Sequence, residues 1–187
     1  MKAKGVFKVI RLTICFALLF ALAAADSFAA SKQEIAAGVN ASLERFDTQV
    51  KGSKEFRQVA KGILVIPNVT KAAFIVGGQY GQGALLVGGR TVGYYSLAAG
   101  SLGWQIGAEK SDVVIIFATD EALKKFQNSE GWEAGVDAEV TLVDKGVDLP
   151  ASTLVSQHPI LGFVFDQKGL MAGVSVKGAK FSKINPD

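Results

Sequence analysis

The sequence of 187 residues contains one cysteine, one histidine and four prolines. A single cysteine excludes a disulfide framework and any zinc site built from cysteine pairs. With one histidine and no acidic run at calcium-loop spacing, we predict neither a bound metal nor a cofactor. Charged residues make up only 20% of the chain and apolar residues 49%, which excludes a chain that is disordered throughout.

The first segment has the layout of a secretory signal peptide. Basic residues precede an apolar run over residues 12–25, which is shorter than the ~20 residues needed to span a bilayer. Small residues follow, with Ser27 and Ala29 at the −3 and −1 positions of a leader-peptidase site. We therefore predict that residues 1–29 are removed and that residues 30–187 form one exported domain, either periplasmic or secreted.

Removal of this leader balances the charge of the chain, because the leader carries four basic residues and one acidic residue. The net charge of +3 then falls to zero, which argues against a protein that binds nucleic acid. The remaining charge is unevenly placed, with net +3 over residues 31–71 and net −3 over residues 72–187. A surface for an anionic partner is therefore expected near the start of the mature chain.

Two helices are predicted at the start of the mature chain. Ser31 and Glu34 form a capping box, and apolar residues then recur at the spacing of one helix face. A shorter helix is predicted over residues 54–61, with Phe56 and Val59 on its apolar side. The apolar face of the first helix comprises Ile35, Val39, Leu43 and Phe46.

After residue 62 the pattern changes to short apolar runs divided by glycine, which is typical of strands. Pro67-Asn68 and Gly88-Gly89 are predicted to be turns, and the segment 166–169 is predicted to be a hairpin turn. The run 112–118 is almost wholly apolar, which predicts a central strand covered on both faces. The predicted strands are residues 63–66, 73–76, 84–87, 112–118, 139–143, 160–165 and 170–176.

The fold class that follows is α+β. The ten glycines within residues 77–107 indicate tight bends, and therefore a strongly curved sheet. We predict N-terminal helices followed by a mostly antiparallel, glycine-rich, barrel-like sheet, with one further helix over residues 119–126.

Three ordered motifs resemble the SYLF domain. They are AKGILVIP at residues 60–67, GWQIGAE at residues 103–109 followed by DVVII, and KGLMAGVS at residues 168–175. The resemblance covers about residues 31–181 and implies a lipid-binding module. SYLF proteins bind phosphoinositides and other anionic phospholipids, and fungal relatives also bind actin filaments. Because an exported protein does not meet cytosolic actin, we expect an anionic envelope phospholipid as its partner and a role in envelope organisation.

The candidate lipid-binding residues form a basic cluster with one aromatic ring. Basic side chains donate hydrogen bonds to phosphate, and a neighbouring ring can enter the headgroup boundary. The alternative is a solvated helix face on which Glu55 offsets one charge. Tyr80, Tyr94, Tyr95 and Trp104 are candidates either for membrane contact or for core packing. The cluster comprises Lys51, Lys54, Phe56, Arg57, Lys61 and Lys71.

Two other classes of function stay open at this point. A small integral outer-membrane barrel needs strands of about 9–11 residues, whereas most apolar runs here are shorter; an envelope structural protein is the related alternative. A hydrolase would need His158 close to Ser152 or Ser156 and to Asp148, but the G-x-S-x-G motif is missing. We assign no catalytic residue and predict a non-enzymatic protein. The glycines of residues 77–83 also lack both nucleotide-loop patterns.

Overall fold

The computed structural model describes residues 30–73, 76–102, 107–144, 149–169 and 176–187. The predicted signal peptide, residues 1–29, lies outside the described residues. The helices are α2 (Lys32–Gln49), α3 (Ser53–Val59), α4 (Asp120–Asn128) and α5 (Ala151–Gln157). The strands are β1 (Gly62–Ala73), β2 (Val76–Val87), β3 (Arg90–Leu102), β4 (Gly107–Phe117), β5 (Gly131–Glu133), β6 (Thr141–Leu142), β7 (Ile160–Gly169) and β8 (Lys180–Ile184).

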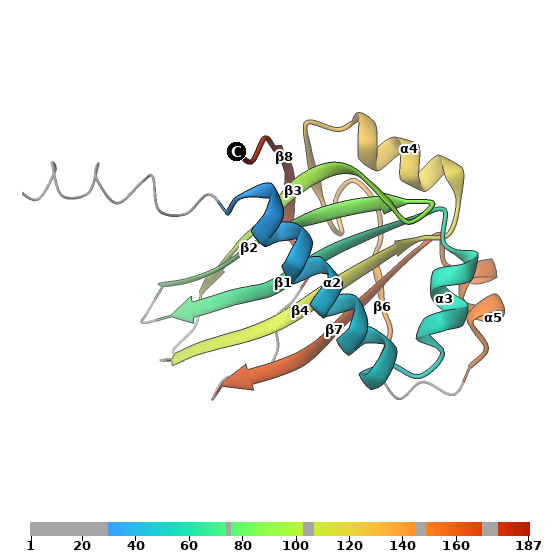
Figure 1. Ribbon diagram of the computed structural model, residues 1–187, viewed down its shortest axis with the longest axis horizontal. Helices are drawn as coiled ribbons and strands as arrows, with labels where there is room; N and C mark the ends of the chain where they lie inside the picture. Colours follow the sequence, from blue (N-terminus) through green and yellow to red (C-terminus); the bar gives the residue numbers. More distant parts are fainter. Residues whose placement is uncertain (1–29, 74–75, 103–106, 145–148, 170–175) are drawn as a thin grey trace, which may run out of the picture.

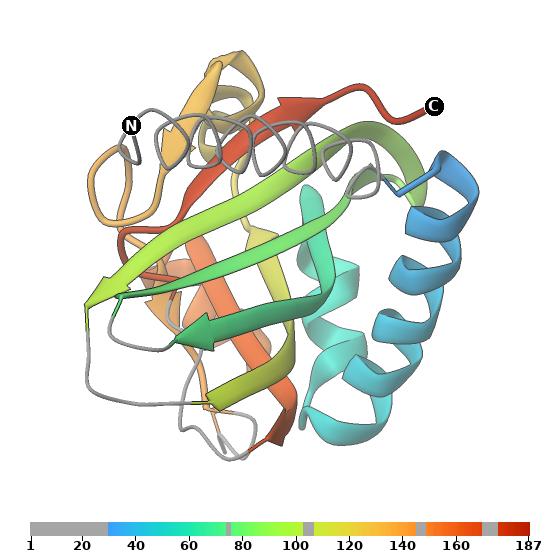
Figure 2. The same ribbon diagram turned by 90° about the vertical axis from the view of Figure 1, so that its left-hand side faces the viewer.

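The strands form one eight-stranded sheet in the order β5-β8-β3-β2-β1-β4-β7-β6. Every pair is antiparallel except β6 with β7. The sheet curls strongly on itself (Figure 2). Helix α2 crosses its outer face, with α3 and α5 beside it, whereas α4 lies at one end (Figure 1). The predicted α+β class with a curved, mostly antiparallel sheet is confirmed.

Helix α2 begins as its sequence predicts. The Ser31 hydroxyl accepts from the Glu34 amide, and the Glu34 carboxylate accepts from the Ser31 amide at 2.8 Å. The Ser31 amide, and after it the Ser31 hydroxyl at 3.1 Å, donate to the Glu34 carboxylate and lower the pKa of this carboxyl. The predicted apolar face is buried, including Phe46, whose ring centroid lies 5.1 Å from that of Phe163 on β7.

Strand β4 is covered on both faces, as its apolar run predicts. Val113, Ile115 and Phe117 enter the core on the inner side of the curl, with Leu123 and Phe126 of α4. The intervening residues of β4, Val114 and Ile116, pack instead into a second core beneath α2, α3 and α5. All five of these β4 side chains are fully buried. The sheet therefore separates two apolar cores.

The turn predicted at Pro67-Asn68 is wrong, because β1 continues through it. The two residues form a bulge between the β1–β4 pairs that Ile66 and Val69 make. Asn68 takes a positive φ of 50°, and its amide donates to Oδ1 of Asp112 on β4 at 2.9 Å. A residue that leaves the ladder thus finds its acceptor on a neighbouring strand.

The hairpin turn predicted at residues 166–169 is also wrong, because β7 runs on to Gly169. The register of β4 with β7 shifts between Asp112 and Lys110, and Asp166 at this shift has φ 52°. Its amide donates to the Oε1 atom of Gln49 at the end of α2, at 3.2 Å. The strand predicted over residues 170–176 falls almost entirely outside the described residues.

The remaining sequence predictions differ from the structure mainly in length. Half of the strand predicted over residues 73–76 lies outside the described residues; Ala73 belongs to β1 and Val76 to β2. The strand predicted over residues 139–143 shortens to β6, and helix α4 confirms the predicted helix near residues 119–126. The sequence did not predict β3, which is long but interrupted by glycine, nor α5, β5 and β8, which are short.

Candidate lipid-binding surface

Helix α3 is held in place by one buried ring. Phe56 is only 1% exposed, and its ring centroid lies 5.0 Å from that of Phe163 on β7. The predicted contact of Phe56 with lipid headgroups is therefore wrong, since its ring belongs to the core beneath α2, α3 and α5. The buried ring instead holds α3 in an orientation in which its opposite side faces the solvent.

Four of the predicted basic residues are exposed on or beside α3: Lys51, Lys54, Arg57 and Lys61. Arg57 forms an ion pair through Nη1 with the carboxylate of Asp47 on α2. Both side chains of this pair are partly exposed, and such a pair contributes only about 0–1 kcal/mol to stability. Arg57 can therefore exchange its partner for a phosphate at small cost.

Lys71 does not belong to this group. It lies near the far end of β1, and a strand advances about 3.3 Å per residue, so most of β1 separates it from Lys61. It stands opposite Glu109 of β4 in the ladder and is partly buried. The grouping of Lys71 with the residues of α3 is not reproduced by the fold.

Glu109 is a feature that the sequence did not single out as a site. Its side chain is 1% exposed, and in the described part of the chain neither carboxylate oxygen has a hydrogen-bond partner. Ser111, two residues further along β4 and on the same face, is also buried without a partner for its hydroxyl. The second SYLF-like motif thus ends at Glu109, whose carboxylate is buried. Buried polar groups are normally hydrogen-bonded to a partner.

Two exposed apolar residues accompany the basic ones. Val59, which was expected on the buried side of its helix, is 37% exposed because α3 ends there and its last turn leaves the core. Val92 on β3 is 51% exposed. A membrane-facing surface built around α3 would therefore offer Val59 in place of Phe56.

The hairpin between β2 and β3 lies at this end of the sheet (Figure 1), and Arg90 follows its turn. Ile63 pairs with Leu86, and Val87 pairs with Arg90 across the Gly88-Gly89 turn. Arg90 is exposed, and these registers place it two strands away from the start of β1, which Lys61 immediately precedes. The sequence predicted the turn but not this placement, which needs the β1–β2 register. We call Lys54, Arg57, Lys61 and Arg90 the basic surface.

Acidic residues also lie near the basic surface. Glu55 is exposed on α3, and Asp120 and Glu121 open α4 just beyond the end of β4. Helix α4 packs against the inner core, whereas α3 packs against the outer one. The two acids of α4 therefore lie on the side of the sheet away from α3.

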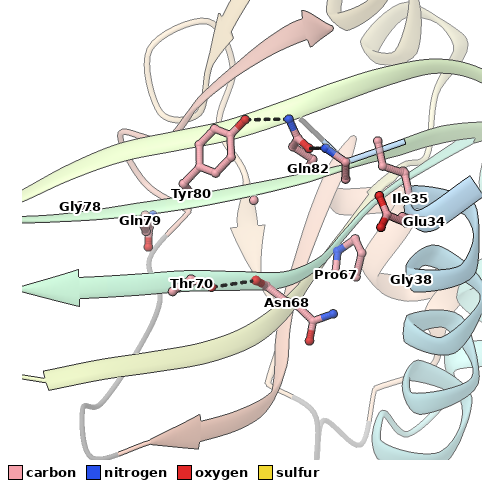
Figure 3. A pocket seen from close by; sticks show the side chains of 12 residues that line it. Glu34, Ile35, Gly38, Pro67, Asn68, Thr70, Gly78, Gln79, Tyr80 and Gln82 are labelled. Carbon is pink, nitrogen blue, oxygen red and sulfur yellow. Dashed lines mark hydrogen bonds between the residues drawn. The ribbon is translucent and has the colours of Figure 1, made fainter. Parts of the chain in front are cut away.

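A groove of about 560 Å³ lies between the first turns of α2 and strands β1 and β2 (Figure 3). Gly38 allows close approach, since a Cβ there would stand 3.0 Å from Cγ of Pro67. On β2, Oε1 of Gln82 accepts from the Ala30 amide at 3.0 Å, and its Nε2 donates to the Tyr80 hydroxyl at 2.8 Å. No Lys or Arg is among the described residues that line this groove, so it is a poor site for phosphate.

The glycine-rich segment 77–83 is part of β2 and pairs with β1 on one side and β3 on the other. Its backbone takes part in the hydrogen bonds between these strands, which agrees with the prediction that it is not a phosphate loop. Tyr95 is 4% exposed and in the core, where burial raises the pKa of its hydroxyl, whereas Tyr80 is 40% exposed. Trp104 lies outside the described residues.

His158 is not brought into a catalytic arrangement within the described residues. Its Nδ1 lies 3.0 Å from the hydroxyl of Thr141 on β6. Ser156 donates instead to the carbonyl of Thr153 at 2.7 Å, and Asp148 lies outside the described residues. Within the described ranges, no three His, Cys, Asp or Glu side chains gather to hold a metal ion. No helix in this part of the chain is both long and apolar enough to cross a bilayer.

Comparison with known proteins places these features in a family context. A family model described as "Ysc84: Las17-binding protein actin regulator" matches residues 98–185. SH3 domain-containing YSC84-like protein 1 is similar, with 29% identity over 125 residues in Xenopus laevis and 30% in Homo sapiens. LAS seventeen-binding protein 3 of Saccharomyces cerevisiae is 30% identical over 128 residues. These alignments cover 64% of this chain but only 28–37% of the relatives' length.

Proposed function

Because the chain belongs to the SYLF (Ysc84) family, we propose that it is a non-enzymatic protein that attaches to anionic phospholipid surfaces through its basic surface. The observation that carries the proposal is the two-sided character of α3. Phe56 is locked into the core, while Lys54 and Arg57 on the same helix are exposed. A fixed helix presents its cations without losing the conformational freedom that a loop would lose on binding.

The expected strength of this attachment is modest. Each Lys or Arg near an anionic membrane contributes about 1 kcal/mol, so the basic surface alone supports weak binding. Insertion of the exposed Val59 and Val92 adds apolar contact, and several copies on one surface would add avidity. We therefore expect a peripheral protein whose binding to membranes weakens as salt is added.

Charge reversal on α3 tests the proposal. The combined substitutions Lys54→Glu, Arg57→Glu and Lys61→Glu turn three positive charges into three negative ones. Binding to acidic liposomes is expected to fall at least about tenfold, because attraction of about 1 kcal/mol per residue becomes repulsion. Flotation of purified protein with neutral and acidic liposomes over a salt series measures the effect.

A matched control carries the same change in net charge elsewhere. Lys110, Lys124 and Lys180 are exposed on β4, α4 and β8, and their reversal to Glu should reduce binding far less. Circular dichroism must show that both triple variants are folded. Undiminished binding by the folded α3 variant, or equal losses in both variants, would contradict the proposed surface.

We further propose that the protein acts after export, on phospholipids of the cell envelope. The support is the leader pattern of residues 1–29. Mass spectrometry of the exported protein is expected to show a chain that begins at or near Ala30. An intact chain beginning at Met1 and anchored in the inner membrane would overturn this part of the proposal.

The family description also names Las17 binding and actin regulation, and the yeast relative is named for binding LAS seventeen. The chain spans 28% of that relative, so the partners of the whole relative do not transfer with the aligned part. An exported protein would not meet cytosolic actin. We therefore do not extend actin binding to this chain.

A further inference from the structure

A second cavity, of about 450 Å³, lies beside the β2–β3 hairpin. Three segments that are distant in the sequence form it: the start of α2, the first part of β3, and the end of β8 with the tail that follows. Figure 2 shows this tail approaching the start of α2. The polar residues that line the cavity are Lys32, Thr91, Tyr94, Tyr95, Lys183 and Asn185.

Backbone pairing holds the walls of this cavity in place. Tyr94 of β3 pairs with Ile184 of β8 in an antiparallel ladder. The amide of Lys32 donates to the carbonyl of Asp187 at 3.0 Å, which fastens the tail to the start of α2. The cavity is thus formed by ordered main chain before any ligand arrives.

Among the described residues that line the cavity, the charged ones are Lys32 and Lys183. Nζ of Lys183 lies 3.7 Å from a carboxylate oxygen of Glu130, whose side chain is 93% exposed, so this ion pair is easily exchanged. Lys32 has no ion pair with any acidic residue in the described part of the chain. The hydroxyls of Thr91 and Tyr94 add neutral donors.

We infer that this cavity binds the phosphate monoester of a lipid headgroup. Two ammonium groups match a phosphate monoester, which carries a charge of about −1.5 to −2 at neutral pH, better than the single charge of a phosphodiester. The exposed Val92 also lines the cavity, which favours a membrane lipid over a free phosphate. This inference rests on the proposed membrane attachment and adds a headgroup preference to it.

Vesicles of phosphatidic acid and of phosphatidylglycerol, adjusted to equal surface potential, test the inference. Wild-type protein is expected to bind the phosphatidic acid vesicles about tenfold more tightly, as two added charge contacts predict. The variant Lys32→Gln/Lys183→Gln should lose this preference yet keep its binding to phosphatidylglycerol. The matched control Lys110→Gln/Lys124→Gln, with both changes on exposed residues away from the cavity, should keep the preference.

The proposed cavity and the proposed basic surface are tested by different variants, so one proposal can be contradicted without the other. Loss of the preference in the cavity variant supports the inference even if the α3 charge-reversal variant binds normally and contradicts the basic surface. No preference in the wild type, or a preference that survives in the cavity variant, overturns the inference.

A parallel titration with soluble glycerol 3-phosphate addresses the source of the phosphate. Cavity-dependent binding of this soluble compound, without a preference among vesicles, would overturn the assignment to a lipid.

Discussion

Replacing Arg45 by methionine is expected to lower the free energy of unfolding by about 3–5 kcal/mol, the cost of leaving a buried charge without its partner. Nη2 of Arg45 on α2 lies 2.6 Å from Oδ2 of Asp112, whose side chain is 1% exposed. The same guanidinium reaches Asp166 of β7 at 3.2 Å through Nε. Without Arg45, the amide of Asn68 is the one donor to Asp112 that remains among the described residues.

A double-mutant cycle separates this ion pair from simple loss of packing. If the charge of Asp112 causes the damage, Arg45→Met/Asp112→Asn should be more stable than Arg45→Met alone, because the neutral amide removes the unpaired charge. Urea unfolding of the four proteins measures the coupling. An Arg45→Met variant within about 1 kcal/mol of wild type would show that water replaces the guanidinium and that the contact contributes little.

Replacing Ile115 by aspartate is expected to prevent folding altogether. Ile115 is fully buried on β4, between Leu64 of β1 and Gly162 of β7. An unpaired carboxylate at this position costs several kcal/mol and also removes apolar contacts from the inner core. The total stability of a domain is typically about 5–15 kcal/mol, so most of it would be lost. Solubility on expression and thermal unfolding followed by circular dichroism give the result.

The conservative variant Ile115→Val provides the comparison. It keeps the site apolar and is expected to cost about 0.5–1.5 kcal/mol, which leaves a cooperative transition at a slightly lower temperature. A soluble Ile115→Asp protein that unfolds cooperatively would mean that β4 is not the central strand of the sheet.

Local signals account for the parts of the fold that the sequence predicted. The capping box at Ser31 and the apolar spacing after it lie within one helix, so they define α2 without reference to other segments. The unbroken apolar run of β4 likewise indicates burial on both faces. In each case the residues that determine the structure are neighbours in the chain.

The bulges could not be distinguished from turns in this way. Pro67-Asn68 has the composition of a turn, but the positive φ of Asn68 is supported by a carboxylate 44 residues away. Asp166 is similarly satisfied by Gln49, 117 residues away. A strand that bends and continues differs from one that reverses only through such distant partners, which residue composition does not reveal.

The candidate surface could be predicted only in part, because it too depends on residues that are far apart in the sequence. Exposure of Lys54 and Arg57 follows from helical spacing once Phe56 faces the core. The separation of Lys71 from them depends on the length of β1, which the apparent turn concealed. The contribution of Arg90 depends on the pairing of β1 with β2, and the second cavity on the return of β8 to β3.

The place of β8 in the sheet has a consequence for the timing of folding. β8 comes last among the strands, yet it pairs with β3, and β5 pairs only with β8. One side of the sheet therefore cannot assemble until residues 180–184 have been synthesised. Contacts of such long sequence separation slow folding. A nascent chain would thus keep this side of the sheet unassembled until late in its synthesis, a delay that is compatible with the proposed export before folding.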